Sequence, residues 1–139
     1  MTSATFDSNV YISAFVFRQK ALRLLHLAID QGVEIAISDE IVDETMRVLR
    51  EKFYWSADRL NEARTLISGF TRRVTPTQRL DVVKADPDDN KIVECAAEAE
   101  SDYLVTGDKG ILQVGSYGKT QMVTPSEFMD RLIGQGRTR

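Results

Sequence analysis

The stretch that decides the fold lies near the N-terminus and reads Ser3-Ala4-Thr5-Phe6-Asp7-Ser8-Asn9. Its short apolar run predicts a strand that ends directly at Asp7. A stretch of the same kind lies near the C-terminus and reads Asp102-Tyr103-Leu104-Val105-Thr106-Gly107-Asp108. Because strand ends converge on one edge of the sheet in an α/β fold, we expect Asp7 and Asp108 to lie close together.

Outward from these stretches, short strand-like runs alternate with helical patterns, which is typical of βαβ units and a parallel sheet. The predicted strands cover residues 4–6, 34–38, 73–75, 103–106 and 121–124. The predicted helices cover residues 20–31, 39–53, 57–70 and 87–100, and a last helix opens with the capping box Thr124-Pro125-Ser126-Glu127. No repeat or Pro/Gly-rich linker interrupts the pattern. We therefore predict one α/β domain over residues 1–134 and a flexible tail over 135–139.

Composition limits the class of protein. With 139 residues, 42% hydrophobic and 28% charged, the chain can build one compact domain with a core. It has no apolar run near the ~18 residues of a membrane span and no signal-peptide pattern, so we expect a soluble, cytoplasmic protein with no membrane contact. One cysteine, Cys95, excludes an internal disulfide, and with the single His26 it leaves too few soft ligands for structural zinc. Any bound metal should have oxygen ligands.

The net charge of −3 argues against broad nonspecific binding to nucleic acid. Four clustered acids would supply more than this whole deficit, however, and a bound cation would reverse their local sign. Basic residues could still form a rim for a phosphate backbone, and the candidates are Arg47, Arg50, Lys52, Arg72, Arg73, Lys109, Lys119, Arg131, Arg137 and Arg139. Charge alone therefore does not decide the substrate.

Four carboxylates stand where a strand ends or a helix begins, and these are Asp7, Glu44, Asp89 and Asp108. Asp89 falls in the middle of the apolar arc of its predicted helix, and burying an unpaired charge is costly. Asp86 is explained by helix capping, and Glu44 lies at the margin of an apolar arc. Taken singly, each acid has a simpler explanation as a turn, cap or surface residue. Together they predict a divalent cation site and a metal-dependent phosphodiesterase.

Three other conspicuous side chains have structural interpretations. We expect His26 to be a partly buried helical histidine, Cys95 to be a small core residue, and Trp55 to form a packed corner rather than a base-stacking platform.

The chain resembles a PIN domain, in particular the small prokaryotic PIN toxins of toxin–antitoxin pairs, the VapC-like ribonucleases. The segments that carry the resemblance lie at residues 6–14, 37–44, 86–91, 102–109 and 123–128. They follow the family's order and span nearly the whole chain. Ser8 stands where the family usually has threonine, which keeps a hydroxyl, and Asp39 stands where a proline is common.

The resemblance implies a parallel five-stranded sheet of order 3-2-1-4-5 with helices on both faces. It also implies a site for Mg²⁺ or Mn²⁺, with Asp7, Glu44, Asp89 and Asp108 as acidic residues and Ser8, Asn9 and Thr106 as polar supports. The implied reaction is hydrolysis of RNA phosphodiester bonds. Further implications are a small antitoxin protein as partner and homodimerisation.

Two alternatives remain open at this stage. A catalytically silent PIN module would bind RNA or a protein partner without cutting. A haloacid-dehalogenase-like phosphatase would use Asp7 as nucleophile, but it requires a second aspartate where this chain has Asn9.

Overall fold

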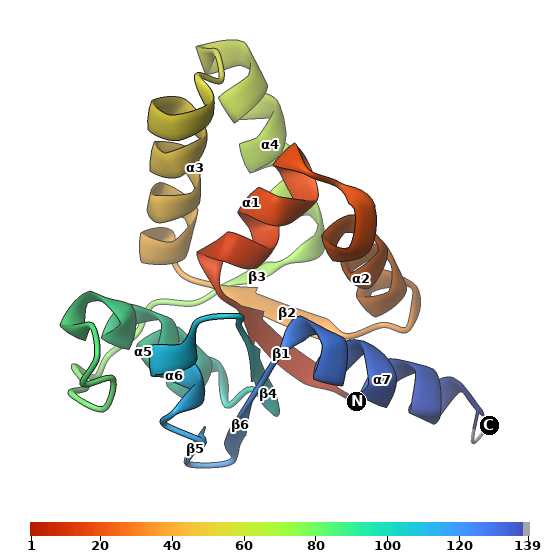
Figure 1. Cartoon of the computed structure of the whole chain (residues 1–139), viewed down its shortest axis with the longest axis vertical. Coiled ribbons are helices and arrows are strands. Elements are labelled where there is room, and N and C mark those ends of the chain that lie inside the picture. Colours follow the sequence, from red (N-terminus) through yellow and green to blue (C-terminus); the bar gives the residue numbers. More distant parts are fainter. Residues whose placement is uncertain (138–139) are drawn as a thin grey trace.

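The strands of this computed structural model, which describes residues 1–137, are β1 (Ser3–Phe6), β2 (Glu34–Ile37), β3 (Arg72–Arg73), β4 (Tyr103–Val105), β5 (Ser116–Tyr117) and β6 (Thr120–Val123). They form one sheet in the order β3-β2-β1-β4-β6-β5 (Figure 1). The first five strands of that order run parallel, which confirms the predicted order 3-2-1-4-5 with β6 as the fifth strand.

The short β5 was not predicted, and it makes the sheet six-stranded rather than five-stranded. It pairs antiparallel with β6, and Gly118, with a φ of 56°, lies in the tight turn between them. A strand of two residues is too short to show an alternating pattern, so the sequence gives little signal for it.

The helices are α1 (Ser8–Val16), α2 (Gln19–Asp30), α3 (Asp39–Phe53), α4 (Ala57–Phe70), α5 (Asn90–Ala99), α6 (Lys109–Leu112) and α7 (Pro125–Arg137), with a 3-10 turn η1 (Pro87–Asp89) before α5. The predicted bounds of α3 and α4 are confirmed. The helix predicted over 87–100 is wrong in its first turn, which is η1. Helix α7 reaches into the segment 135–139 expected to be a tail, of which 138 and 139 lie outside the described residues, so the boundary at 134 stays a prediction.

Helix α1 was missed because its sequence, SNVYISAFV, is apolar on nearly every side. Five of its nine residues are buried, so it lacks the polar stripe that marks an amphipathic helix. Helix α6 is only four residues long, too short for any periodic pattern.

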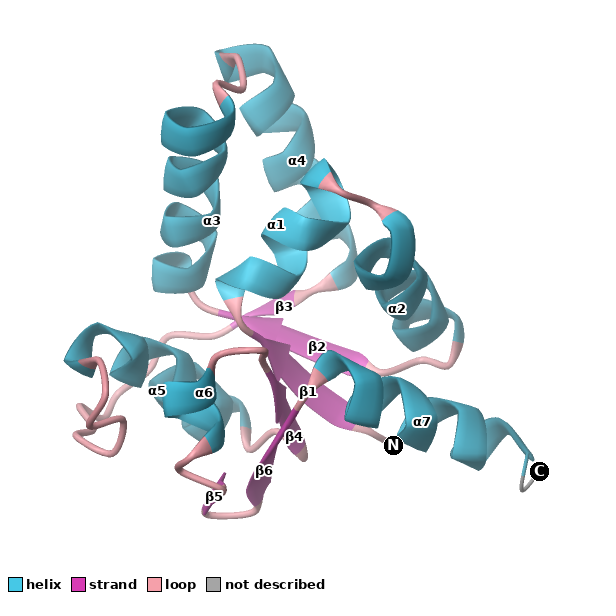
Figure 2. Ribbon diagram, in the orientation of Figure 1, coloured by secondary structure: helices cyan, strands magenta, loops and turns pink. Residues whose placement is uncertain are grey.

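Helices cover both faces of the sheet, as the resemblance implied. Figure 2 shows α5 and α6 on one side and α1, α2 and α7 on the other. The connections from β1 to β2 and from β2 to β3 step in one direction, whereas the connection from β3 to β4 steps back across the sheet. Right-handed crossovers therefore put α1 to α4 on one face and α5 on the opposite face.

The core is centred on β1. The ring of Phe6 meets Tyr11 and Phe128 edge-to-face, with ring centroids 5.9 and 5.8 Å apart. Cys95 is buried, as expected, and Trp55 is a packed corner, held between Phe15 and the guanidinium of Arg59. The capping box of α7 is confirmed because Thr124 N–H donates to the Glu127 carboxylate and Thr124 Oγ1 accepts from Glu127 N–H.

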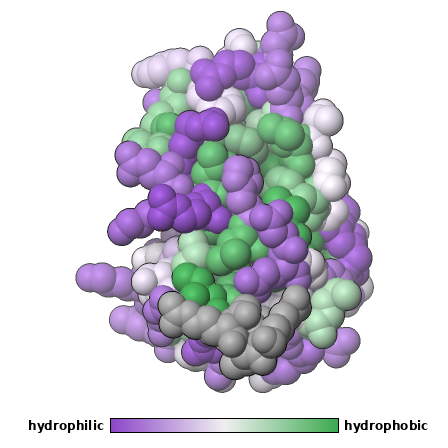
Figure 3. Space-filling model, turned by 90° about the vertical axis from the view of Figure 1, so that its right-hand side faces the viewer, coloured by the Kyte–Doolittle hydropathy of each residue, from purple (hydrophilic) through white to green (hydrophobic). Residues whose placement is uncertain are grey.

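One structural expectation is wrong, since His26 is exposed on the solvent side of α2. On the side of the molecule that carries α2 and α7, apolar side chains reach the surface between polar ones (Figure 3). Large hydrophobic side chains that are exposed in the described part of the chain include Phe17, Ile29 and Leu66. No helix among the described residues is long and apolar enough to cross a membrane.

Candidate functional site

The candidate site lies at the carboxyl ends of β1 and β4, the two central strands. Their crossovers leave in opposite directions, so no connection covers the edge between them, and a crevice forms there. Asp7 directly follows β1, and its N–H extends the ladder by donating to Val105 O at 3.0 Å. Asp7 and Thr106 therefore enter the crevice side by side from neighbouring strands.

Asp7 is buried, with 4% of its surface exposed. Its Oδ2 accepts a hydrogen bond from Thr106 Oγ1 at 2.7 Å, and its Oδ1 lies 3.3 Å from Ser8 Oγ. Burial raises the pKa of Asp7, the bond from Thr106 opposes this, and the negative charge of Glu44 adds to the rise. Asp7 is held firmly, but its charge is not neutralised.

Ser8 connects Asp7 to Glu44 of α3. Its hydroxyl lies 2.5 Å from Glu44 Oε2, much closer than to Asp7. Because a serine hydroxyl has only one hydrogen to donate, Glu44 is its main acceptor. The hydroxyl that the resemblance implied at this position therefore lies between two acids and donates mainly to Glu44.

Glu44 also has a cationic neighbour. Lys91 Nζ, from the first turn of α5, lies 3.4 Å from Glu44 Oε1, and Arg47 lies 3.9 Å away. The Lys91 side chain is only 22% exposed, which is unusual for a lysine. Lys91 has no role among the expectations from sequence, although its place two residues after Asp89 could have suggested one.

Asp89 is the residue whose pKa is raised by all three other acids of the candidate site. It lies at the end of η1, where burial and the negative charges of Asp108, Asp86, Asp7 and Glu44 raise its pKa to about 7. Its predicted place on a buried helical stripe is replaced by a place in a 3-10 turn. The expectation that a carboxylate at this position needs a partner, because burying an unpaired charge is costly, is consistent with this raised pKa.

Asp108 has a structural task as well. Its Oδ2 accepts from Ile111 N–H at 3.0 Å and so caps α6, and its own N–H donates to Thr106 Oγ1 at 3.0 Å. Thr106 thus joins Asp7 to Asp108. Gly110 is required nearby, because a Cβ there would stand 2.8 Å from Ala85 Cβ and 3.2 Å from Asp108 Oδ2. The glycine lets the segment before η1 approach Asp108.

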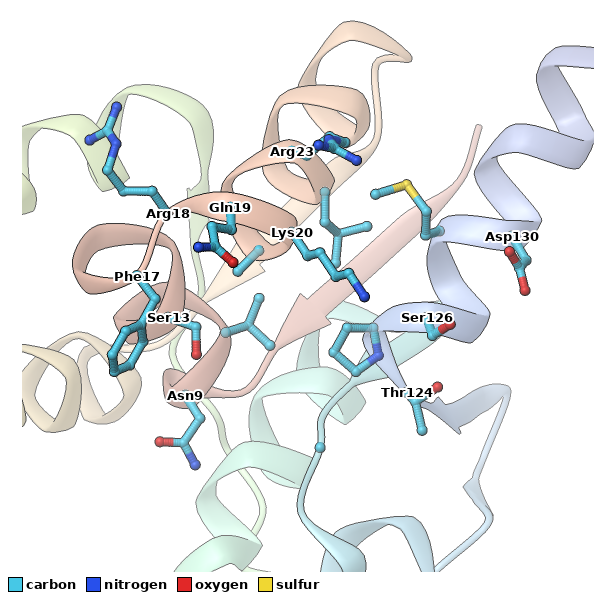
Figure 4. Close-up of a pocket in the computed structure, with 16 residues that line it drawn as sticks. Asn9, Ser13, Phe17, Arg18, Gln19, Lys20, Arg23, Thr124, Ser126 and Asp130 are labelled. Carbon is cyan, nitrogen blue, oxygen red and sulfur yellow. The ribbon is translucent and has the colours of Figure 1, made fainter.

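The remaining predicted support, Asn9, differs from Ser8 and Thr106. It is exposed in the first turn of α1, and its side chain makes no hydrogen bond to the four acids within the described structure. Figure 4 shows it at one end of a surface groove. A second groove, of about 680 Å³, reaches Glu44 and Lys91 from another side.

The donor set suits a hard divalent cation, since every candidate ligand is a carboxylate oxygen and Asp89 carries uncompensated repulsion. As they stand, however, the described residues include no group of three or more His, Cys, Asp or Glu side chains placed to hold a metal ion. Asp108 is turned to cap α6, and Glu44 is turned to Ser8 and Lys91. The residues fit a cation in chemistry, and both of these side chains already have other partners.

Comparisons with known proteins agree with this fold. The VapBC2 complex from Rickettsia felis, solved bound to a DNA fragment from its promoter, contains a chain 11% identical to this one, with a TM-score of 0.64 over 88% of this chain and 98% of that chain. A FitAB complex bound to an IR36 DNA fragment contains one 16% identical, with a TM-score of 0.51 over 88% and 94% of the two chains. At these identities, the likeness concerns the fold.

No curated protein matches the sequence. The family model described as PIN domain matches residues 3–110, which contain all four acids of the site. The match covers well over half of the chain, and the chain therefore belongs to the PIN domain family.

Proposed function

We propose that this chain is a Mg²⁺- or Mn²⁺-dependent endoribonuclease and the toxin of a toxin–antitoxin pair. The observation that carries the proposal is the meeting of the candidate acids at the carboxyl ends of β1 and β4, where Thr106 joins Asp7 to Asp108. Ser8 in turn joins Asp7 to Glu44. Burial and the negative charges around it also raise the pKa of Asp89 to about 7. Acids that repel one another in a crevice are stabilised by a divalent cation. PIN domains are generally nucleases that use divalent metals, which supports the same chemistry.

The four acids would divide the work. Asp7, Asp89 and Asp108 would hold the cation, directly or through water, and Glu44 would hold it or orient the attacking water. A bound divalent cation lowers the pKa of water and offsets the negative charge that builds on the phosphate in the transition state. No histidine is needed as base, which suits a chain whose single histidine, His26, is exposed on α2.

The chain's own polar groups prepare these acids. Thr106 fixes the Asp7 carboxylate through its hydroxyl and holds the backbone of Asp108 through its oxygen. Lys91 offsets the charge of Glu44. Asp89 is partly protonated near neutral pH and must lose that proton before it can act as a ligand, so cation affinity should rise with pH.

A second candidate is a PIN module that binds RNA or a protein partner without cutting. One observation favours it: no three acids among the described residues are already arranged around a metal position. The two candidates differ in a single property, which is turnover in the presence of metal.

Cleavage of labelled RNA separates these candidates. Wild type should cut in Mn²⁺ or Mg²⁺ and not in EDTA, whereas Asp89→Asn should be inactive. Asp58→Asn is the matched control, because Asp58 is an exposed aspartate in the first turn of α4, a helix that holds none of the four acids. Asp58→Asn should retain activity. Equal cleavage by wild type and Asp89→Asn would refute the site, and RNA binding by wild type without any cleavage would favour the silent module.

The toxin assignment extends to partners. The resemblance to PIN toxins and the neighbours VapBC2 and FitAB, both solved with DNA, support a small antitoxin partner and a cytoplasmic location. The exposed apolar side chains of Ile29 on α2 and Leu66 on α4 support a protein contact, with an antitoxin or with a second copy of the chain. Expression of wild type should arrest growth, and expression of Asp89→Asn should not.

A further inference from the structure

A surface groove of about 700 Å³ starts beside the acids and runs between α1, the start of α2 and the start of α7 (Figure 4). Its end near the site is formed by Asn9, two residues after Asp7, and by Gly107, directly before Asp108. The apolar side chains that line it are Val10, Ala21, Leu24, Pro125 and Met129. None of the four acids lines the groove, but Asn9 and Gly107 are close sequence neighbours of two of them, so the groove ends next to the candidate site. It also offers an apolar lining.

Cations stand along this groove. Arg18, Lys20 and Arg23 line it, and Asp130 is the one acid among the described residues that do so. Figure 4 shows Lys20 extending across the groove toward the start of α7, with Arg23 farther along α2 and Arg18 directed the other way. The groove thus has an excess of positive charge next to an acidic centre.

These three cations differ from those that the sequence analysis expected to form a rim. Within the described structure, none of the three is in an ion pair or a side-chain hydrogen bond. Six of the expected rim residues do have such partners, and these are Arg47, Arg50, Arg72, Arg73, Lys119 and Arg131. A cation without a partner is available to an anionic ligand, whereas a paired cation must first give up its partner.

An exposed aromatic side chain completes the groove. Phe17 is 63% exposed, and its ring stands edge-on to Phe53 at 6.0 Å between centroids. It precedes Arg18 and Gln19, which have φ values of 64° and 27°, a backbone region that residues other than glycine seldom occupy. This unusual corner between α1 and α2 places the Phe17 ring and, one residue after Gln19, the Lys20 side chain along the same groove.

We propose that this groove binds a single-stranded segment of the RNA substrate on its way to the acids. Lys20 and Arg23 contact phosphates, the apolar lining contacts sugars and bases, and Phe17 stacks on a base. A single strand fits better than a duplex because only unpaired bases offer a free face for stacking. The substrate class rests on the proposed ribonuclease function, but the binding mode does not depend on cleavage.

Binding of a short labelled single-stranded RNA to the full chain, measured by fluorescence anisotropy in EDTA, tests the groove separately from catalysis. The variant K20Q/R23Q should raise the Kd about tenfold, and the slope of log K against log salt should become shallower by about 1.4, near 0.7 per phosphate contact. The matched control K52Q/R64Q removes two exposed cations on α3 and α4 and should change both quantities much less. D130N should tighten binding.

Each outcome of these binding experiments either supports or refutes the proposed groove. If both double variants weakened RNA binding equally, the overall charge of the chain would explain binding and the proposed groove would be refuted. The proposal would also be refuted if duplex RNA or a polyglutamate peptide competed as well as the single strand. RNA cleavage by wild type without an effect of K20Q/R23Q would overturn the groove and leave the ribonuclease intact. Selective loss of binding in K20Q/R23Q, with no cleavage by wild type in Mn²⁺, would support the groove and refute the proposed catalysis.

Discussion

At the two ends of the strand pair β1 and β4, the surroundings shift the pKa values of the acids in opposite directions. At the amino end, partial burial would raise the pKa of Asp102, but hydrogen bonds from Ser3 and the nearby Lys119, 3.2 Å away, lower it overall. At the carboxyl end, burial and mutual repulsion raise the pKa of Asp7 and Asp89. An acid supplied with its own donors and cation stabilises the fold, whereas acids left facing one another indicate a site for a ligand.

The largest expected difference between the two ends is in activity. Asp89→Asn should lower the rate of RNA cleavage in Mn²⁺ roughly a hundredfold or more, because it removes a proposed cation ligand. Asp102→Asn should leave that rate within a few-fold of wild type and instead lower the free energy of unfolding by about 1 kcal/mol. Initial cleavage rates and urea unfolding measure the two effects. Comparable loss of cleavage in both variants would abolish the distinction.

A bound Mg²⁺ or Mn²⁺ ion should also stabilise the folded chain through the acids at the carboxyl end of β1 and β4, and not through Asp102. At a Mg²⁺ or Mn²⁺ concentration of about 100 Kd, a cation that binds only the folded chain adds about 2.7 kcal/mol to the free energy of unfolding. The Tm of wild type and of Asp102→Asn should rise on adding the metal, and the Tm of Asp89→Asn should rise much less. A similar rise in all three proteins would place the cation away from the proposed acids.

The pH dependence of stability should have opposite signs at the two ends. The pKa of Asp89 is about 7 in the folded chain against an ordinary value of 3.8, so the folded state holds the extra proton between these values. In EDTA, this group therefore lowers stability as pH rises from about 4 to about 7, by roughly 1 kcal/mol after allowance for solvent screening.

Asp102 makes stability rise with pH, which is the opposite of the effect of Asp89. Its folded pKa is lowered, so its stabilising effect is present above the ordinary value and is lost as pH falls below that value. Urea unfolding of wild type and Asp102→Asn at pH 3 and pH 5 tests the sign at Asp102, and urea unfolding of wild type and Asp89→Asn at pH 5 and pH 7.5 tests the sign at Asp89. If wild type and Asp89→Asn lost equal stability over this interval, repulsion at Asp89 would not be the cause.

The smallest expected difference is in the free energy of unfolding when Lys119 or Lys91 is replaced. Lys119→Met should change the free energy of unfolding by only a few tenths of a kcal/mol, because Lys119 and Asp102 are an exposed pair. Lys91→Met should cost about 1 kcal/mol in EDTA, since it leaves the half-buried Glu44 beside other acids. Mg²⁺ should restore part of that loss in Lys91→Met alone. Equal costs for both lysines would mean that Lys91 is an ordinary surface residue.

Much of the fold could be predicted because it depends on local patterns. The apolar runs before Asp7 and Thr106 mark β1 and β4, and the bounds of α3 and α4 follow from their amphipathic pattern and serine caps. Helix α1 could not be predicted, because a helix buried on most sides has no polar stripe. The antiparallel β5 was also missed, because two residues show no period.

The sequence by itself determined which acids are candidates, because residue types and short apolar strands can be read directly from it. The resemblance to PIN domains added the strand order, which brings Asp7 and Asp108 to one edge of the sheet. Only the tertiary structure decided how each acid is used. It placed Lys91 against Glu44, turned Asp108 toward the first turn of α6, and gave Asp89 several negative neighbours. Among the residues that the structure describes, it also gave Lys20 and Arg23 no ion-pair partner in the groove next to the site. These properties depend on distances between residues far apart in the chain, because charge interaction and burial are set in space.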